Sequence, residues 1–463
     1  MERKSNLKKA STFYLFGTLF NKGIGFITVP IFTRILSVSD YGIVTTYNSW
    51  VSILMMFISL ALYMAVRASF VDYKEHTKDF LSVITTFTCL FGCLFSLIVI
   101  VISLIAPINL SLSILILCLI QALATAIIEN VSMFFMMNYQ YKARTALMVL
   151  PNLLSTIVSI FLIKKVLSSE LYFGRIVPNA IITLLFGLMA LLYSFKGTKV
   201  RFNKEYLQYG LKISVPLVLH GIALNILSQS DRTMITMIRS SEETGVYGLI
   251  YNFSMIATVI TTAFDGIWVP FFTRKMNERD YNSINAFAEK YVEFMSVAMI
   301  GVILVGPEIV KLLSTKAYWE GIKIIPPIVL ANYFIFIYTM YVNVEHYYKK
   351  TVFISINTTI AAVSNILLNI VFIYIWGYVG AAYTTLISYI LSLILHYRYA
   401  RKINSKVFGL KHYIYPLIVI FVSVVAFYLF INNWYIRWLT AIITVVIFGV
   451  KEKDFLLNTF LKR

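Results

Sequence analysis

The sequence predicts an all-α polytopic membrane protein with about 14 transmembrane helices. Only 13% of its 463 residues are charged and 59% are hydrophobic, whereas a soluble globular protein carries about 25% charged residues. Apolar runs of about 20 residues, long enough to cross a bilayer as a helix, recur along the chain. An internal repeat then divides these runs into two comparable halves.

The candidate spans follow one another with short connections. We place them at residues 11–32, 43–66, 80–106, 112–136, 146–163, 172–195, 211–230, 245–268, 291–313, 322–343, 351–375, 378–397, 413–431 and 434–450. An even number of spans puts both termini on the same side of the membrane. With cytoplasmic termini, about 28 of the 40 Lys and Arg residues face the cytoplasm, as the positive-inside rule requires.

The net charge of +19 therefore reflects cytoplasmic loops, and we do not expect nucleic-acid binding. The prediction is a multi-pass protein of the bacterial cytoplasmic (inner) membrane with both termini in the cytoplasm.

The first span carries a lysine at its midpoint. Thr18, Asn21, Lys22, Gly25 and Thr28 recur at three- and four-residue spacing, so they share one helical face. A lysine at the centre of a membrane costs about 2.5 to 3.5 kcal/mol on insertion scales. We therefore expect this face to line a polar interior.

A motif at the end of the first span returns in the middle of the chain. Residues 238–248 resemble residues 33–42 with one inserted residue, and an offset of 206 places Tyr41 on Tyr247. The same offset aligns the second span with the eighth, which carries a polar stripe at helical spacing: Tyr247, Tyr251, Ser254, Thr258, Thr262 and Asp265. Six spans separate the copies, so the two halves have the same orientation, which is the pattern of a parallel repeat.

The repeat predicts the domain organisation. We expect a six-helix bundle over residues 1–200 and a second over residues 201–410, related in parallel around a central cavity. Residues 411–463 would add two peripheral, lipid-facing helices and a basic cytoplasmic tail, because few polar residues lie in these last spans.

Two segments resemble a known family. The first span ends in VPIFTRILSVSDYG, residues 29–42, and the junction of spans seven and eight is ILSQSDRTMITMIRSSEETGVYG, residues 226–248. Both are similar to segments of polysaccharide-export flippases of the Wzx type, which translocate O-antigen or capsule repeat units. These belong to a superfamily that also contains MATE drug exporters and the lipid II flippase.

The resemblance implies a function and a mechanism. Similar proteins move undecaprenyl-diphosphate-linked oligosaccharide units from the cytoplasmic to the outer leaflet by alternating access around a cationic central cavity. The implied partners are this lipid-linked oligosaccharide, membrane lipids and a polysaccharide polymerase of the same pathway. A lipid II-type cell-wall precursor flippase, a MATE-like cation or drug exporter and a non-transporting membrane scaffold are the alternatives.

Several cations are candidates for binding a diphosphate. Lys22 with Asn21 could meet the phosphates inside the bundle, and Arg34, Arg232 and Arg239 could form an anion site near the outer ends of spans one and seven. The alternative is structural, with Lys22 paired to an acid and Arg232 and Arg239 paired locally to Asp231 and Glu242. Arg175 could face the cavity or extend to the membrane interface.

Three further titratable residues lie inside predicted spans. Glu129 follows Gln121 and Thr125 on one face of span four, and Asp265 lies near the cytoplasmic end of span eight. Either acid could couple transport to a proton or sodium ion, or could pair with Lys22. His220 in span seven is a weaker candidate, because a single intramembrane histidine is commonly a hydrogen-bonded packing residue.

The sequence contains no enzyme signature. Its five histidines are scattered, so no metal cluster is expected, and there is no GxxxxGK[ST] loop for nucleotide binding. We therefore expect a transporter without catalytic residues, metal or organic cofactor, with proton or sodium coupling as an open possibility.

Overall fold

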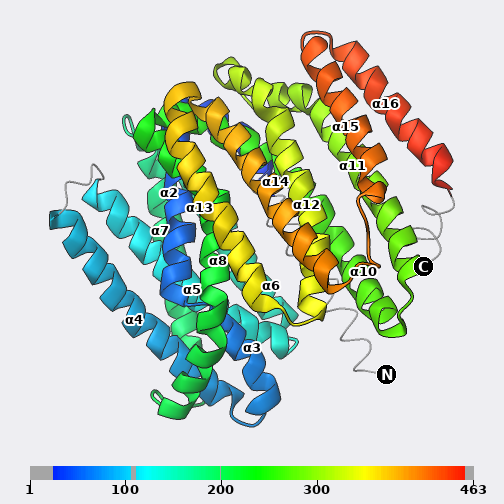
Figure 1. The fold of residues 1–463 in the computed structure, drawn as a ribbon. Coiled ribbons are helices and arrows are strands. Elements are labelled where there is room, and N and C mark those ends of the chain that lie inside the picture. Colours follow the sequence, from blue (N-terminus) through cyan, green and yellow to red (C-terminus); the bar gives the residue numbers. More distant parts are fainter. Residues whose placement is uncertain (1–23, 25, 106–110, 199, 454–463) are drawn as a thin grey trace. The chain divides into compact units, whose positions relative to one another are not determined.

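The computed structural model describes residues 24, 26–105, 111–198 and 200–453, and these form helices joined by short loops (Figure 1). Among them, 12 helices are long and apolar enough to cross a membrane, and one further pair of helices, bent by 52°, raises the number to 13 if it forms one span. The predicted all-α polytopic class is confirmed. All predicted spans from residue 43 onward coincide with described helices, while most of span 11–32 lies outside the described residues.

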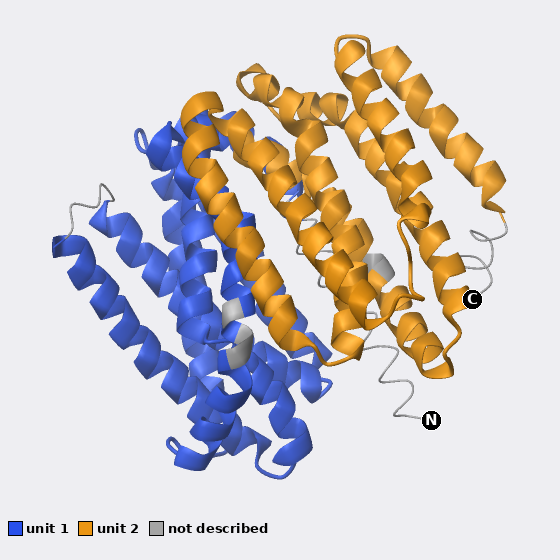
Figure 2. Cartoon of the chain, in the orientation of Figure 1, with its two compact units in different colours: residues 1–245 blue, residues 246–463 orange. Residues whose placement is uncertain are grey.

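The chain divides into two compact units at residue 245 (Figure 2). Unit 1 contains the short helix Phe26–Ile35 and the start of α9. Its other helices are α2 (Val38–Ser59), α3 (Leu62–Asp72), α4 (Thr77–Ile105), α5 (Leu112–Met137), α6 (Tyr141–Lys165), α7 (Phe173–Phe195) and α8 (Lys204–Ile238). The boundary at residue 200 that the repeat predicts remains a prediction about the two bundles.

Unit 2 begins within α9 (Ser241–Ser254). It continues through α10 (Ile256–Glu278), α11 (Tyr281–Leu313), the 3-10 helix η1 (Lys316–Ile324), α12 (Ile325–Tyr347), α13 (Thr351–Trp376), α14 (Tyr378–Ile403), α15 (Lys411–Leu429) and α16 (Trp434–Lys451).

The two copies of the repeated motif each start a helix in the same way. The Asp40 N–H donates to the Ser37 hydroxyl at 3.0 Å, and the Glu243 N–H donates to the Ser240 hydroxyl at 3.2 Å. These caps satisfy N–H groups that the first turn of a helix leaves unpaired. They pair Ser37 with Ser240 and Asp40 with Glu243, each 203 residues apart, so the structural register differs from the offset of 206 suggested by Tyr41 and Tyr247.

Unit 1 contains two helix interruptions that contact each other. Leu60 (φ 44°) and Ala61 (φ 52°) adopt the left-handed conformation between α2 and α3, which costs a residue with a side chain about 1 to 2 kcal/mol. The hydroxyl of Ser214 donates to the Ala61 carbonyl at 3.2 Å. Ser214 immediately precedes the 52° bend in α8, which lies between Lys204–Val215 and His220–Ile238, where Pro216 was expected to interrupt the helix.

Each unit has an apolar core that fixes its helices. In unit 1, Leu62, Phe80, Ile84, Val131 and other buried residues of α3, α4 and α5 pack together. In unit 2 the core is rich in aromatic rings, and Trp268, Phe272, Tyr291, Phe336 and Phe408 are almost completely buried. Such close packing fixes the rotation of each helix about its axis, and so decides which polar side chains face protein.

The last two helices are anchored on α11 by polar contacts that the sequence analysis did not anticipate. Arg437 of α16 is 1% exposed, and its guanidinium contacts the Glu308 carboxylate of α11 at 2.5 and 3.1 Å. Near the other end of α16, the Lys451 ammonium lies 2.7 Å from Glu293 of α11. These helices are apolar on their outer side, as expected of peripheral helices, but they are joined to the unit by buried charge.

Candidate functional site

A row of hydroxyl and amide side chains joins α2 to α8 and the start of α9 in unit 1. We call this row the α2–α8 seam, formed by Ser39, Thr46, Ser49, Gln229, Thr236, Ser241 and Thr244. Its α2 members are spaced by seven and three residues, so they share one face of the helix. Packing of α2 against α8 turns that face inward, which makes the seam an internal polar surface of unit 1.

Hydrogen bonds cross the seam at three levels. The hydroxyl oxygens of Ser39 and Ser241 lie 2.6 Å apart, and those of Thr46 and Thr236 lie 2.7 Å apart. At the third level, Ser49 donates to the side-chain oxygen of Gln229 at 3.3 Å. A typical hydrogen bond contributes about 0.5–1.5 kcal/mol net, so a contact of this kind can hold two helices together and still separate.

Two glycines allow the helices to approach closely where the seam begins. A Cβ atom on Gly42 would lie 1.8 Å from the Ser241 carbonyl oxygen, and one on Gly245 would lie 2.2 Å from the Val38 carbonyl oxygen. Neither position has room for a side chain. Hydroxyl contacts between Ser39 and Ser241 therefore depend on glycine at both places.

Arg232 lies beside the seam. It is 4% exposed, and its guanidinium donates to the Gln229 side-chain oxygen at 2.8 Å and to the Ser228 carbonyl at 2.7 Å. Gln229 therefore accepts hydrogen bonds from both Arg232 and Ser49. This candidate is a buried cation within the polar surface rather than a charge on an exposed rim.

Arg175 is a half-buried cation near the start of α7. Its guanidinium donates to the hydroxyls of Thr156 and Ser159 on α6 at 3.2 and 3.5 Å and lies 4.4 Å from the centre of the Phe32 ring. None of the ion pairs found among the described residues includes Arg175. Hydroxyl and aromatic partners orient the guanidinium without neutralising its charge.

The other two candidate arginines are exposed. Arg34 donates to the Pro30 carbonyl at 2.7 Å, and Arg239 forms an ion pair with Glu243 at 3.1 Å, one turn along the chain. The local pair predicted for Arg239 thus exists, but its partner is Glu243 rather than Glu242. An exposed pair of this kind contributes about 0–1 kcal/mol.

The candidate acids and His220 are distributed over both units. Glu129 lies on α5, where its Oε2 atom is buried and makes no hydrogen bond with the described residues. His220 lies on α8 just beyond its bend, and it is half-buried. Asp265 is half-buried on α10 of unit 2, and Asn21 and Lys22 lie outside the described residues.

Sequence reasoning did not identify the threonine and serine contacts of the seam. Thr46 and Thr236 are 190 residues apart, and isolated threonines in apolar segments are common, so only the repeat motif beside them gave a signal. It also did not identify Glu345 and His396, a fully buried pair in unit 2. Within the described part of the chain, no group of three or more His, Cys, Asp or Glu residues could hold a metal ion.

Comparison with known proteins was made at the level of sequence and of fold. The family model for polysaccharide biosynthesis proteins matches residues 7–276, more than half of the chain. No curated protein matches the sequence significantly.

Several solved structures share the fold. A lipid II flippase, MurJ, in an inward closed conformation aligns with a TM-score of 0.72 at 18% identity, over 95% of this chain and 99% of that one. An inward-facing multidrug resistance MATE family transporter aligns with a TM-score of 0.63 at 11% identity, over 86% and 98%. A transporter of the MOP superfamily from Pyrococcus furiosus, described as having a binding pocket of reverse polarity, gives 0.57 at 13% identity, over 86% and 96%.

Proposed function

This chain belongs to the polysaccharide biosynthesis protein family, and from that membership we propose that it is a flippase for polyprenyl-diphosphate-linked oligosaccharides. In this proposal it moves such units, as used for O-antigen or capsule, from the cytoplasmic to the outer leaflet of the bacterial inner membrane. Both termini would be cytoplasmic, and the polymerase of the same pathway would receive the product. The fold shared with transporters supports a carrier rather than an enzyme.

The observation that carries the proposal is the state of Arg175. Its guanidinium lies in a membrane-spanning helix with hydroxyl and aromatic neighbours and with no ion-pair partner among the described residues. A cation held in this way can bind an incoming phosphate oxygen without first breaking an ion pair. Arg232, Arg34, Arg239 and Lys22 with Asn21 are the further anion-binding candidates.

The α2–α8 seam would act as a gate in this mechanism. On the proposed orientation α2 begins at the outer face, so a closed seam would seal that side while the head group enters from the cytoplasm between the halves. Separation of the seam would then expose the head group to the outside, with the polyprenyl tail remaining in lipid. An inside-negative potential favours outward anion movement by about 2.3 kcal/mol per charge per 100 mV, so ATP is not required.

Two alternatives remain within the same fold. A lipid II-type precursor flippase differs in its sugar and shares the diphosphate, so the same cations would serve. A MATE-like cation exporter is favoured by the buried, unbonded Oε2 atom of Glu129 and by Asp265, since acids attract organic cations. Proton or sodium coupling through Glu129, Asp265 or His220 is compatible with each of these functions.

Uptake into inverted vesicles tests the proposal. Inversion places the cytoplasmic face outside, so labelled polyprenyl-diphosphate oligosaccharide should become enclosed in the lumen, and more so when the lumen is positive. Arg175→Ala should reduce this uptake at least about tenfold, corresponding to the loss of about 1.4 kcal/mol from one charged hydrogen bond.

Arg239→Ala is the matched control, because that guanidinium is exposed and already paired with Glu243; it should retain most of the uptake. Movement of small organic cations without movement of the lipid-linked substrate would instead support the exporter and direct attention to Glu129 and Asp265.

A further inference from the structure

Unit 2 contains a carboxylate and an imidazole that are both completely buried. Glu345 lies near the end of α12 and His396 lies on α14, and each side chain is 0% exposed. The Nδ1 atom of His396 is 3.1 and 3.0 Å from the two carboxylate oxygens of Glu345. Since an N–H must bridge these atoms, Nδ1 carries a proton and donates it to Glu345.

The second nitrogen of this imidazole has no partner. Nε2 of His396 is buried and makes no hydrogen bond with the described residues. With Nδ1 committed to Glu345, Nε2 is the atom at which the ring gains or loses a proton. Without that proton the buried pair has a net charge of −1, and with it the pair is neutral. A buried net charge is unfavourable, so the surroundings favour proton binding.

The environment of the ring also favours the charged imidazole. Tyr338 stacks on His396 with ring centres 5.4 Å apart and planes 15° apart, and Tyr389 stacks on the other side of Tyr338. The electron-rich face of a tyrosine attracts a cation placed over it. The imidazolium would thus be held between a carboxylate in its plane and an aromatic ring on its face.

The pair lies close to water although it does not contact it. His346, Lys349 and Lys350, at the end of α12 and just beyond it, are exposed. The Lys350 N–H donates to the carbonyl of Glu345 at 2.8 Å, which folds the connecting turn over the pair. A small opening of this turn would let a water molecule reach Nε2.

Few other titratable groups face the pair. His346 on α12 and Tyr399 on α14 are close enough to interact with the Glu345 charge, and α13 contributes only Tyr374, which is 74% exposed at the helix's opposite end. The charged residues of α10 and α11 have recorded partners elsewhere, as in Lys275–Asp280, Glu289–His412, Glu293–Lys451 and Glu308–Arg437. Asp265 of α10 has no recorded contact with the pair.

We propose that Glu345 and His396 form a proton-binding site, with the exchangeable proton on Nε2 of His396, and that its occupancy is coupled to transport. The coupling part rests on the proposed flippase function. The proton comes from water at the outer face, is bound as the imidazolium while the unit is closed, and is released to the cytoplasm past the turn at 346–350. An inward proton movement of this kind would drive the outward movement of the substrate.

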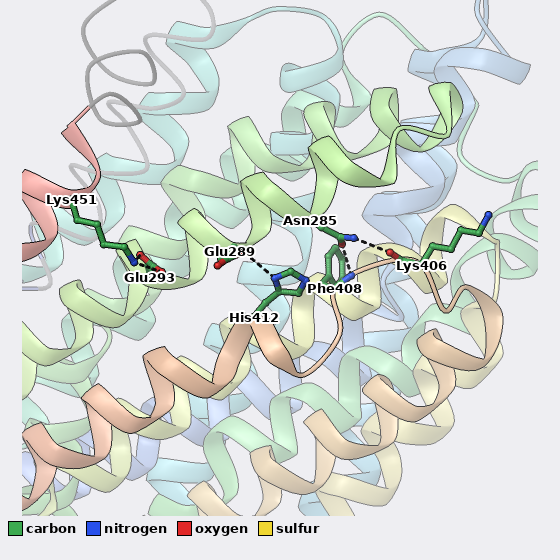
Figure 3. A network of polar contacts seen from close by, with 7 residues as sticks. All are labelled: Asn285, Glu289, Glu293, Lys406, Phe408, His412 and Lys451. Carbon is green, nitrogen blue, oxygen red and sulfur yellow. Dashed lines mark hydrogen bonds and ion pairs between the residues drawn. The ribbon is translucent and has the colours of Figure 1, made fainter.

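A second carboxylate–histidine pair in the same unit provides the matched control. Nδ1 of His412 lies 3.2 Å from Glu289, and His412 is buried, but the Glu289 side chain is 53% exposed (Figure 3). Water can compensate the Glu289 charge in every protonation state, so this pair has no reason to retain a proton. Figure 3 also shows that Glu289 is part of an α11 stripe with Asn285 and Glu293 that anchors neighbouring segments.

The decisive variant is Glu345→Gln combined with His396→Gln. Two glutamines can keep a hydrogen bond between α12 and α14, but neither side chain titrates. In vesicles with an imposed gradient of one pH unit, acid on the outer face, coupling of one proton should raise the outer-to-inner ratio of labelled polyprenyl-diphosphate oligosaccharide about tenfold in the wild type. The double glutamine variant should show no response, and Glu289→Gln with His412→Gln should respond like the wild type.

The outcomes separate the proton site from the flippase function. A wild-type protein that flips the substrate without responding to the gradient, or a double glutamine variant that responds fully, would overturn the proton site and leave the flippase intact. If the wild type flips no lipid-linked oligosaccharide, the proposed function fails. Nitrogen NMR of histidine-labelled protein then decides the site alone, since a His396 charge that stays constant between about pH 5 and about pH 8 would refute it.

Discussion

Gly42 and Gly245 face each other's helices in a reciprocal way. The Cα of Gly42 lies against the carbonyl of Ser241, the first residue of α9, and that of Gly245 lies against the carbonyl of Val38, the first residue of α2. Each glycine is four residues after the first residue of its own helix, and the two are 203 residues apart. Two copies of one repeated motif thus contact each other through the same positions.

Gly42→Ala should weaken this contact. A Cβ atom 1.8 Å from a backbone oxygen forces one helix to move, and overpacking of this kind costs about 1–3 kcal/mol. The expected result is a lower midpoint of thermal unfolding in detergent, with Gly245→Ala behaving alike. Gly301→Ala on α11 is the control, because no atom lies within 4 Å of its added Cβ, and alanine favours a helix by about 0.5–1 kcal/mol. Equal destabilisation at all three positions would show that the reciprocal contact is unimportant.

A disulfide between Ser39→Cys and Ser241→Cys should lock the seam. The two hydroxyl oxygens are 2.6 Å apart, so cysteine sulfurs at these positions need little backbone movement to join. In a background with Cys89, Cys93 and Cys118 replaced by alanine, oxidation should stop substrate movement and a reductant should restore it. The Ser39→Cys single variant should be unaffected by oxidation. Full transport by the cross-linked protein would exclude the seam as a gate.

Arg437 should matter more for stability than Lys451, although both join α16 to α11. Arg437 is 1% exposed in its pair with Glu308, whereas Lys451 is 47% exposed in its pair with Glu293. Removing one partner of a buried ion pair costs about 3–5 kcal/mol, and an exposed pair is worth about 0–1 kcal/mol. Unfolding temperatures of Arg437→Met and Lys451→Met test this order, and a larger loss for Lys451→Met would contradict it.

Asp280 should make the stability of the α11 start depend on pH. Hydrogen bonds from Ser283, with the Lys275 ammonium nearby, lower the pKa of this carboxyl to about 2, below the unfolded value of about 3.9. A lowered pKa in the folded state means that the stabilisation is complete above about pH 4 and is lost as the pH falls through about 2.

The Asp280→Asn variant isolates that charge effect, because asparagine can still cap the helix. Its unfolding temperature should differ from the wild type above about pH 4 and approach it in stronger acid. A difference that is constant with pH would mean that the Asp280 charge contributes nothing.

Much of the fold could be predicted from the sequence. In a membrane every backbone N–H and C=O must be paired within its own segment, so a long apolar run has essentially one available structure. The predicted spans from residue 43 onward therefore agree with the described helices, as does the break expected at Pro216.

The candidate site could be predicted only in part. The repeated motif directed attention to Arg232 and Arg239, and the structure brings Arg232 into the seam while Arg239 pairs with Glu243 in place of Glu242. Arg437, in a span expected to be peripheral, proved to be buried. The register of the repeat also differs, since helix capping and glycine contacts select a spacing of 203.

The sequence by itself determined the class of the protein, its family and the positions of nearly all its helices, because these depend on local composition and on periodicity. Only the tertiary structure decided which polar side chains meet. Thr46 finds Thr236, Arg437 finds Glu308, and Glu345 finds His396. These partners are 51 to 190 residues apart, and their meeting depends on the depth and rotation of each helix, which packing against its neighbours sets.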